Sequence, residues 1–233
     1  MYRTRGILLA SVALLAALGA RADAALTVRY VNPQGLPAMI AEVNDRGDTR
    51  ISQGNQYAVL TVGGVTYLLL SDLSGTFAIR QEDWFAVNLA AVNKAMPAAD
   101  KDAGKDLPPY EIVRGGNEVV AGRTGTLWTV RQKGAPDTAG FDLVICEDAD
   151  LAPIGVAFER QMAASTAGMA EVMGSAGGLG TKMAEVMKKG AMIRMSRVLR
   201  LESVKAGPVP DADFVLPPTV LTREQYAARI AGR

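Results

Sequence analysis

The chain of 233 residues carries 25 basic and 24 acidic side chains, one cysteine and no histidine. A nearly neutral chain without a basic stripe lacks the phosphate attraction that dominates nucleic-acid binding, so nucleic acid is not an expected partner. The absence of histidine excludes Ser-His-Asp and Cys-His nucleophilic catalysis and any His-ligated zinc or copper(II) site. Because no other nucleophile or cofactor motif is recognisable, we expect a non-enzymatic protein without a cofactor or a metal site.

The first 24 residues have the features of a secretory signal peptide. Arg3 and Arg5 precede an uncharged apolar run over residues 7–18, and residues 22–24 read Ala-Asp-Ala, a small-x-small pattern suited to a signal peptidase. The apolar run is too short to span a bilayer comfortably, and no later run predicts a transmembrane segment. We therefore expect a soluble periplasmic protein cleaved after Ala24, with a retained signal anchor as the alternative.

Short apolar segments separated by turn residues predict an antiparallel β-meander at the start of the mature chain. The candidate strands cover residues 26–31, 38–43, 49–52, 57–62, 65–70 and 76–80. Gly63 and Gly64, between two apolar runs, are typical of a two-residue hairpin loop. Residues 84–96 change to a three- and four-residue period, which predicts a helix. Residues 97–109 are rich in Ala, Asp, Lys, Gly and Pro, which indicates a solvated linker.

A second series of candidate strands covers residues 110–113, 119–120, 126–131 and 141–146, with turns at 115–117 and 121–122. We interpret Trp128 as a core anchor, with stacking on a ligand as the alternative. Cys146 ends an apolar run and is expected to be a buried, unreactive thiol. The acidic residues that follow it, Glu147, Asp148 and Asp150, are interpreted as a solvated turn in preference to a calcium site.

A methionine-rich stretch over residues 159–195 is the most biased part of the chain. It holds seven of the ten methionines: Met162, Met169, Met173, Met183, Met187, Met192 and Met195. The spacing predicts two amphipathic helices joined by a glycine-rich loop at residues 174–180; Met162, Thr166, Met169 and Met173 share one face of the first, and Met183 and Met187 share one face of the second. Three interpretations stay open: packing against a sheet, an adaptable lining for an apolar ligand or partner, and thioether coordination of Cu(I).

Residues 193–204 alternate between apolar and polar side chains, which predicts one half-buried strand with Met195 on its apolar face. Arg197 interrupts that face, and a charge there must reach solvent, pair with a carboxylate or meet a ligand. Several prolines follow this strand. Thr222 and Gln225 then form a capping-box pattern that predicts the start of the last helix.

This order of elements resembles the half-barrel fold of the LolA and LolB lipoprotein-localisation carriers and their exported relatives of unknown function. The resemblance rests on the signal peptide, the early meander, residues 116–130 (GNEVVAGRTGTLWTV) and residues 210–218 (PDADFVLPP). It implies an α+β fold: a strongly bent antiparallel β-sheet, or half-barrel, with helices covering the concave face, which in the carriers holds acyl chains. The methionine-rich helices depart from the carrier pattern, and we place them as an insertion at about residues 159–190 of a single domain over residues 25–233.

These observations predict a protein that binds an apolar ligand, such as a lipid or an acyl chain, between the sheet and the methionine-rich helices. The candidate ligand-binding residues are Met162, Met169, Met173, Met183, Met187, Met195, Trp128 and Arg197. The alternative is an envelope structural or interaction protein with a packed core, whose helical cap docks on a protein partner.

Overall fold

The computed structural model describes residues 25–54, 57–95, 108–136, 139–173 and 178–231, apart from the side chains of residues 93, 95 and 167–173. The predicted signal peptide, most of the predicted linker and residues 174–177 of the predicted glycine-rich loop lie outside the described residues.

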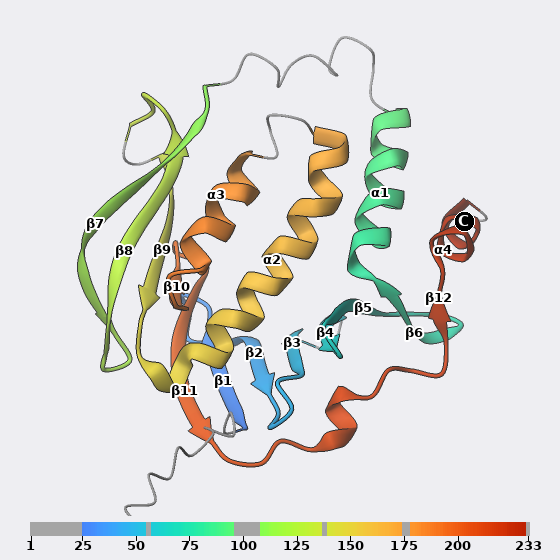
Figure 1. Cartoon of the computed structure of the whole chain (residues 1–233), viewed down its shortest axis with the longest axis horizontal. Helices are drawn as coiled ribbons and strands as arrows, with labels where there is room; N and C mark the ends of the chain where they lie inside the picture. Colours follow the sequence, from blue (N-terminus) through green and yellow to red (C-terminus); the bar gives the residue numbers. More distant parts are fainter. Residues whose placement is uncertain (1–24, 55–56, 96–107, 137–138, 174–177, 232–233) are drawn as a thin grey trace, which may run out of the picture.

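Twelve strands form one curved, open sheet in the described part of the chain (Figure 1). They are β1 (Leu26–Val31), β2 (Pro37–Val43), β3 (Thr49–Gln53), β4 (Tyr57–Val62), β5 (Val65–Asp72), β6 (Gly75–Arg80), β7 (Tyr110–Val120), β8 (Arg123–Gln132), β9 (Phe141–Cys146), β10 (Ala191–Met195), β11 (Leu199–Ala206) and β12 (Val220–Leu221). Their spatial order is β12-β6-β5-β4-β3-β2-β1-β11-β10-β9-β8-β7. Neighbouring strands are antiparallel, except that β12 is parallel to β6.

The α-helices of the described residues are α1 (Gln81–Ala95), α2 (Ala152–Met173), α3 (Gly178–Met187) and α4 (Arg223–Ala231). Figure 1 shows α3, α2 and α1 side by side across one face of the sheet, with α4 beyond α1 and next to β12. In this arrangement α2 contacts β2, β5 and β10, and α3 contacts β7, β8 and β9. The α+β fold class and the bent sheet predicted from the sequence are therefore confirmed.

The main hydrophobic core lies between the sheet and these helices. Phe158 of α2 and Tyr30 of β1 are both buried, and their rings meet edge to face with centroids 5.9 Å apart. The hydroxyl of Tyr30 donates a hydrogen bond of 2.7 Å to the carbonyl oxygen of Met192 on β10. Burial of the aromatic rings stabilises the packing, and this hydrogen bond satisfies the one polar group that Tyr30 brings into the core.

A smaller core covers the opposite face of the sheet at β4. Leu60 of β4 packs with Val209 and Phe214, which belong to the proline-containing segment after β11. Arg50 of β3 donates a hydrogen bond of 3.1 Å to the carbonyl oxygen of Asp213 in the same segment. Successive strand residues point to opposite faces, so β4 is buried on both sides because the main core covers one face, and the segment after β11, which includes a 3-10 helix at Asp211–Phe214, covers the other.

The hairpin predicted at Gly63 and Gly64 is confirmed. β4 ends at Val62 and β5 begins at Val65, and these two residues are paired across the turn. Gly63 and Gly64 have φ angles of 57° and 80°. This left-handed conformation at both loop positions favours glycine, which carries no Cβ.

The turn predicted at residues 115–117 is wrong. β7 runs without a break from Tyr110 to Val120, and the register against β8 shifts between Arg114 and Asn117. A Cβ added to Gly115 would lie 3.1 Å from Cγ of Leu127. Glycine therefore permits a close approach to the neighbouring strand at this register shift instead of ending the strand.

The single strand predicted over residues 193–204 is also wrong. β10 ends at Met195, β11 begins at Leu199, and the two strands pair with each other as a hairpin. Ser196 has a φ angle of 43° in the turn between them. The apolar and polar alternation continued across the turn because both strands present apolar residues to the same core, which concealed the turn in the sequence.

Candidate functional site

Two of the methionines in the methionine-rich stretch are part of the closed core. Met187 at the end of α3 is 3% exposed, and Met192 on β10 is 2% exposed. Ile154 and Phe158 of α2 and Val186 of α3 are buried beside them in the same cluster. Core packing therefore accounts for Met187, which the sequence placed among the candidate ligand-binding residues.

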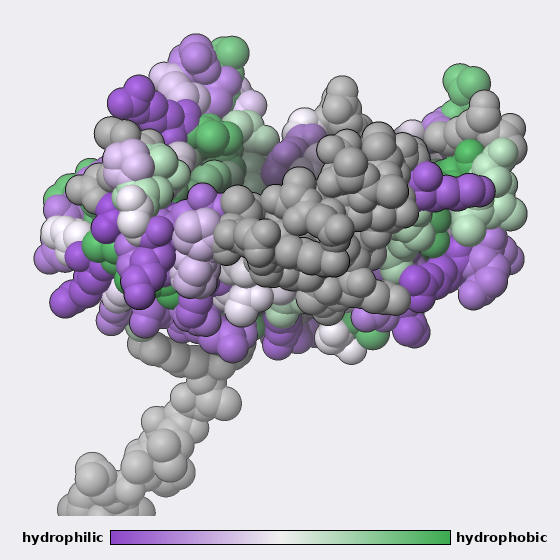
Figure 2. Space-filling view, turned by 90° about the horizontal axis from the view of Figure 1, so that it is seen from above, coloured by the Kyte–Doolittle hydropathy of each residue, from purple (hydrophilic) through white to green (hydrophobic). Residues whose placement is uncertain are grey.

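Other apolar side chains on the same face are only partly buried, and we call them the apolar rim. They come from α2, α3, β7, β8 and β10, and they are Tyr110, Ile112, Trp128, Met162, Leu179, Met183 and Met195. All of them pack against the buried core while keeping part of their surface exposed. Figure 2 shows hydrophobic residues on the wall of a hollow between the β7 to β9 end of the molecule and its centre.

The strand register explains how the rim is assembled. Trp128 of β8 and Met195 of β10 are each paired with Leu143 of β9, so the three side chains lie on one face with the fully buried Leu143 in the middle. The start of α3 lies over β7, because a Cβ added to Gly178 would be 3.4 Å from Cδ2 of Tyr110. The structure thus brings Trp128, Met183 and Met195 into one region.

Met169 and Met173 lie on α2, but their side chains are outside the described residues. Met162, on the same predicted face, is partly buried against the core. Of the three methionines predicted to share one helix face, only Met162 has a described side chain, so the shared face stays a prediction.

Trp128 is partly buried and has two cations near its ring. Nζ of Lys189 lies 4.7 Å from the ring centroid, and Cζ of Arg114 lies 5.9 Å from it. Attraction between a cation and the negative face of an indole ring is worth about 0.5–1 kcal/mol at exposed sites. These contacts hold Trp128 at the boundary between the core and the surface.

Arg197 does not belong to the apolar rim. It lies in the turn between β10 and β11, where its side chain is exposed to solvent. The hypothesis that it interrupts the apolar face of a strand depended on the missed hairpin. Arg194, which the sequence did not single out, is the arginine with a defined role here: its guanidinium binds the carboxylate of Glu118 with distances of 2.8 and 2.9 Å.

Two of the acidic residues after β9, Asp148 and Asp150, form ion pairs. Arg123 of β8 lies 2.8 Å from a carboxylate oxygen of Asp148 and 2.6 Å from one of Asp150. The hydrogen bond from Arg123 holds the pKa of Asp150 below its usual range. Among the described residues, no group of three or more His, Cys, Asp or Glu side chains is placed to hold a metal ion. Cys146 is buried as predicted, and burial raises the pKa of its thiol.

A polar contact connects α1 to α2 within the apolar interior. Gln81, 3% exposed at the start of α1, donates a hydrogen bond of 2.6 Å from Nε2 to Oγ of Ser165. Oε1 of Gln81 and the hydroxyl of Thr166 are buried without a hydrogen-bond partner among the described residues. Leaving one such group unsatisfied costs about 1–3 kcal/mol, and these are the two buried side-chain atoms without a partner in the part of the chain that the structure describes.

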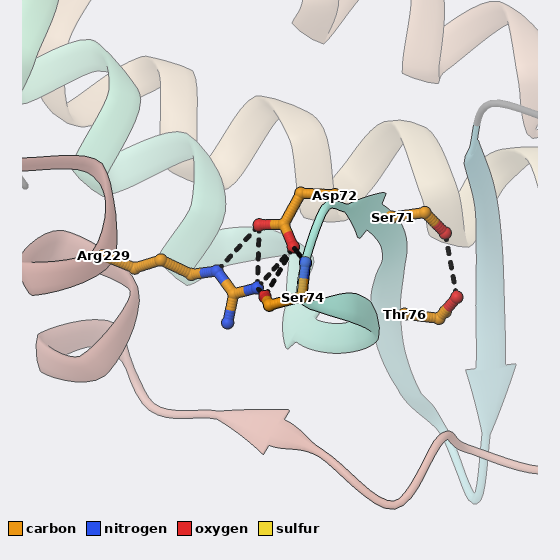
Figure 3. Close-up of polar contacts among 5 residues, drawn as sticks. All are labelled: Ser71, Asp72, Ser74, Thr76 and Arg229. Carbon is orange, nitrogen blue, oxygen red and sulfur yellow. Dashed lines mark hydrogen bonds and ion pairs between the residues drawn. The ribbon is translucent and has the colours of Figure 1, made fainter. Parts of the chain in front are cut away.

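A second hollow, of about 910 Å³, lies between the β5–β6 turn and α4. Arg229 of α4 points into it and binds Asp72, with its Nη2 2.6 and 2.7 Å from the two carboxylate oxygens and its Nε 2.9 Å from Oδ2 (Figure 3). Ser74 contacts both residues. Hydrogen bonds from Arg229 and Ser74 hold the pKa of Asp72 well below its usual range.

Arg229 also lies over the ring of Phe77, with Cζ 4.3 Å from the centroid. Because the guanidinium and the carboxylate already satisfy each other, they offer little to a ligand. We call Asp72, Ser74 and Arg229 the α4 latch, since they attach the last helix to the sheet. The sequence analysis missed the latch because its partners are 157 residues apart.

Comparisons with known proteins give a weak likeness in fold. No protein-family model matches the chain, and no curated protein matches it. Among solved structures, the crystal structure of MucB is similar with a TM-score of 0.32 and 13% sequence identity, over 84% of this chain and 58% of the MucB chain. The present chain thus corresponds to less than two thirds of MucB, and a likeness at this TM-score supports no functional inference. None of the helices that the structure describes combines the length and the apolar character needed to cross a membrane.

Proposed function

We propose that this protein is a non-enzymatic, exported protein of the cell envelope that binds an apolar ligand, such as a lipid or an acyl chain, against the apolar rim. The observation that carries the proposal is the contrast in burial on one face of the sheet. Leu143 and Met192 are closed off from solvent, whereas Trp128, Met183 and Met195 next to them keep exposed apolar surface. Covering that surface with a ligand would remove it from water, which is favourable in proportion to the area covered.

The chemistry of the rim supports a ligand of variable shape. Methionine side chains are unbranched and polarisable, so they re-pack around different apolar surfaces at low cost. Met162, Met183 and Met195 come from three different elements, two of which are helices lying on the sheet. A small movement of α3 relative to α2 would change the distances among them without breaking a strand pair.

The direct test is native mass spectrometry of protein purified from an expressing periplasm, followed by titration with a fluorescent fatty-acid probe. We expect a co-purifying lipid and a saturable increase in probe fluorescence. The absence of both would refute apolar-ligand binding. A ligand-free protein that crosslinks through α2 or α3 to one defined envelope protein would support the docking alternative instead.

A pair of matched variants tests whether the ligand binds at the apolar rim. Leu179→Gln combined with Met183→Gln puts two amides among the rim side chains and is expected to weaken probe binding by about tenfold or more, since each buried polar group without a partner is costly. Leu36→Gln is the control, because Leu36 is 60% exposed in the turn before β2. Equal probe affinities for the two variants would mean that the ligand does not bind at the apolar rim.

Export is a separate part of the proposal and has its own test. N-terminal sequencing of the protein from a periplasmic fraction is expected to begin at Ala25. Retention of residues 1–24 in a membrane fraction would support the signal-anchor alternative.

A further inference from the structure

The two edges of the sheet differ in how their backbone groups are paired. At one edge, the two residues of β12 pair with Ala78 and Ile79 and cover part of β6. At the other edge, β7 with its 11 residues is the last strand of the sheet (Figure 1). No strand of the described residues pairs with the outer side of β7. Such an edge presents unpaired N–H and C=O groups, to which another strand can be added.

Hydrogen bonding to β8 determines which residues of β7 direct their backbone groups outward. The N–H of Lys133 donates to the carbonyl oxygen of Pro109 at 2.9 Å, in continuation of the register between the two strands. Pro109 and Lys133 are therefore a hydrogen-bonded pair. Because hydrogen-bonded and non-hydrogen-bonded pairs alternate along an antiparallel ladder, the N–H and C=O groups of Tyr110, Ile112 and Arg114 point away from β8 to the outer edge.

A bulge limits the length of this edge. The register shift between Arg114 and Asn117 places Gly115 and Gly116 opposite one residue of β8, and a bulge bends the strand that carries it. The regular part of the edge therefore covers residues 110–114. An antiparallel strand added there would exchange both backbone hydrogen bonds with each outward-directed residue.

The side chains at the outward-directed positions determine what kind of strand fits. Alternate residues of a strand share one face, and here Tyr110 and Ile112 belong to the apolar rim, whereas Arg114 lies near the ring of Trp128. Arg114 is exposed and takes part in none of the ion pairs of the described residues. Residues opposite Tyr110 and Ile112 should therefore be apolar, and the residue opposite Arg114 should be acidic.

A second copy of this chain does not meet that requirement. A residue that directs its backbone groups to the edge forms hydrogen-bonded pairs only with another such residue. In a second copy these residues are again Tyr110, Ile112 and Arg114, none of which is acidic. Pairing of two β7 edges would thus leave Arg114 without a carboxylate, so the charge favours a different partner.

We propose that residues 110–114 bind an extended segment of another protein by antiparallel strand addition. Read from its N-terminus, this segment carries an acidic residue opposite Arg114 and then, at alternate positions, apolar residues opposite Ile112 and Tyr110. The inference adds a protein-binding edge to the molecule, and it does not depend on whether a lipid binds at the apolar rim.

The test measures the fluorescence polarisation of a labelled peptide that contains Glu-Thr-Val-Thr-Val, titrated with the purified protein. Methylation of both valine backbone nitrogens removes N–H groups that would bond to β7, and it should weaken binding by about tenfold or more. Methylation of both threonine nitrogens removes N–H groups that point away from β7, so this matched peptide should bind clearly more tightly. Lys in place of Glu should weaken binding about two- to fivefold.

Variants connect the binding to the named residues. Ile112→Pro removes an outward N–H without removing a hydrogen bond to β8, and it should weaken peptide binding about fivefold or more. Arg114→Glu should reverse the preference between the Glu and Lys peptides. Arg200→Glu, the same change at an exposed position of β11, should behave as the wild type. Circular dichroism establishes that each variant is folded, and Arg114→Glu tests the edge independently if Ile112→Pro does not fold.

Three results would overturn the proposal. The first is equal weakening by the two methylation patterns, or no binding of the unmodified peptide at millimolar concentration, which would exclude strand addition. The second is equal affinity for the Glu and Lys peptides, which would exclude an acidic segment selected by Arg114. The third is a wild-type dimer that Ile112→Pro converts to a monomer, measured by light scattering after size exclusion, which would assign the edge to a second copy.

Discussion

The two ends of the curved sheet are held by different kinds of contact. At the β7 to β10 end, α2 and α3 lie on apolar side chains that are buried at the centre and partly exposed at the rim. At the β5, β6 and β12 end, α4 is attached by the ion pair between Arg229 and Asp72. Apolar packing has no preferred direction, whereas a bidentate ion pair fixes one geometry. The apolar end can therefore re-pack at low cost, whereas the latched end keeps its shape.

The largest effect is expected where the apolar end is fully packed. Phe158→Ala removes a buried ring that meets Tyr30 edge to face, and it should lower the free energy of unfolding by about 3–5 kcal/mol. Urea unfolding followed by circular dichroism measures this loss. Phe85→Ala, which removes a partly exposed ring on α1, is the matched control and should cost clearly less. Equal losses would mean that α2 is not anchored through Phe158.

The second-largest effect is a difference in stability between replacing a fully buried methionine and replacing a methionine of the apolar rim. Met187→Ala empties a buried position and should lower the free energy of unfolding by about 2–5 kcal/mol. Met183→Ala removes a partly exposed side chain and should cost less than half as much, while changing the affinity for a fluorescent fatty-acid probe. Urea unfolding and probe titration on both variants give the two values. If Met183→Ala were as destabilising as Met187→Ala, the rim would be ordinary core.

A third prediction concerns the pH dependence of the α4 latch. The folded-state pKa of Asp72 is depressed by its hydrogen bonds, so the latch contributes stability that is fully present above the unfolded pKa of about 3.9 and is lost as pH falls through the folded value. Hydrogen exchange of residues 223–231, corrected for intrinsic rates, should show protection that is constant from pH 7 to 5 and falls at lower pH.

Two variants test whether this loss belongs to the latch. Asp72→Asn should reduce the protection of α4 already at pH 7 and remove most of its dependence on pH. Asp45→Asn, in the exposed turn after β2, should leave the protection profile unchanged. An α4 that stays equally protected in Asp72→Asn would show that Phe77 and Tyr226, and not the latch, hold the helix.

The fold could be predicted from the sequence as far as local patterns determine it. The alternating segments predicted most strands, and the Gly63-Gly64 pair predicted the hairpin turn at the correct residues, because two consecutive positive φ angles strongly favour glycine. β12 has two residues and pairs in parallel with β6. It could not be predicted, because so short a strand has no period and depends on a partner far away in the sequence.

In the candidate site, too, local sequence patterns could not predict which side chains are buried. Spacing placed Met183 and Met187 on one helix face, but only packing decides that Met187 is buried and Met183 is part of the rim. Gln81 precedes the apolar period of its helix, so no periodic signal marked it as an inner residue. Thr222 and Gln225 lie three residues apart, and there the sequence predicted the contact itself.

The smallest effect is expected at this predicted cap. The backbone N–H of Thr222 donates to Oε1 of Gln225 at 2.9 Å, and the N–H of Gln225 donates to Oγ1 of Thr222 at 3.3 Å, which confirms the capping box. Thr222→Ala removes one of the two bonds and should destabilise α4 by about 0.5–1 kcal/mol. Hydrogen exchange should report faster exchange in the first turn of α4 while the urea midpoint of the whole protein stays nearly constant. Thr222→Ser keeps the hydroxyl and should behave as the wild type. A loss in Thr222→Ala as large as that in Asp72→Asn would mean that the cap, and not the latch, is the main attachment of this end of the molecule.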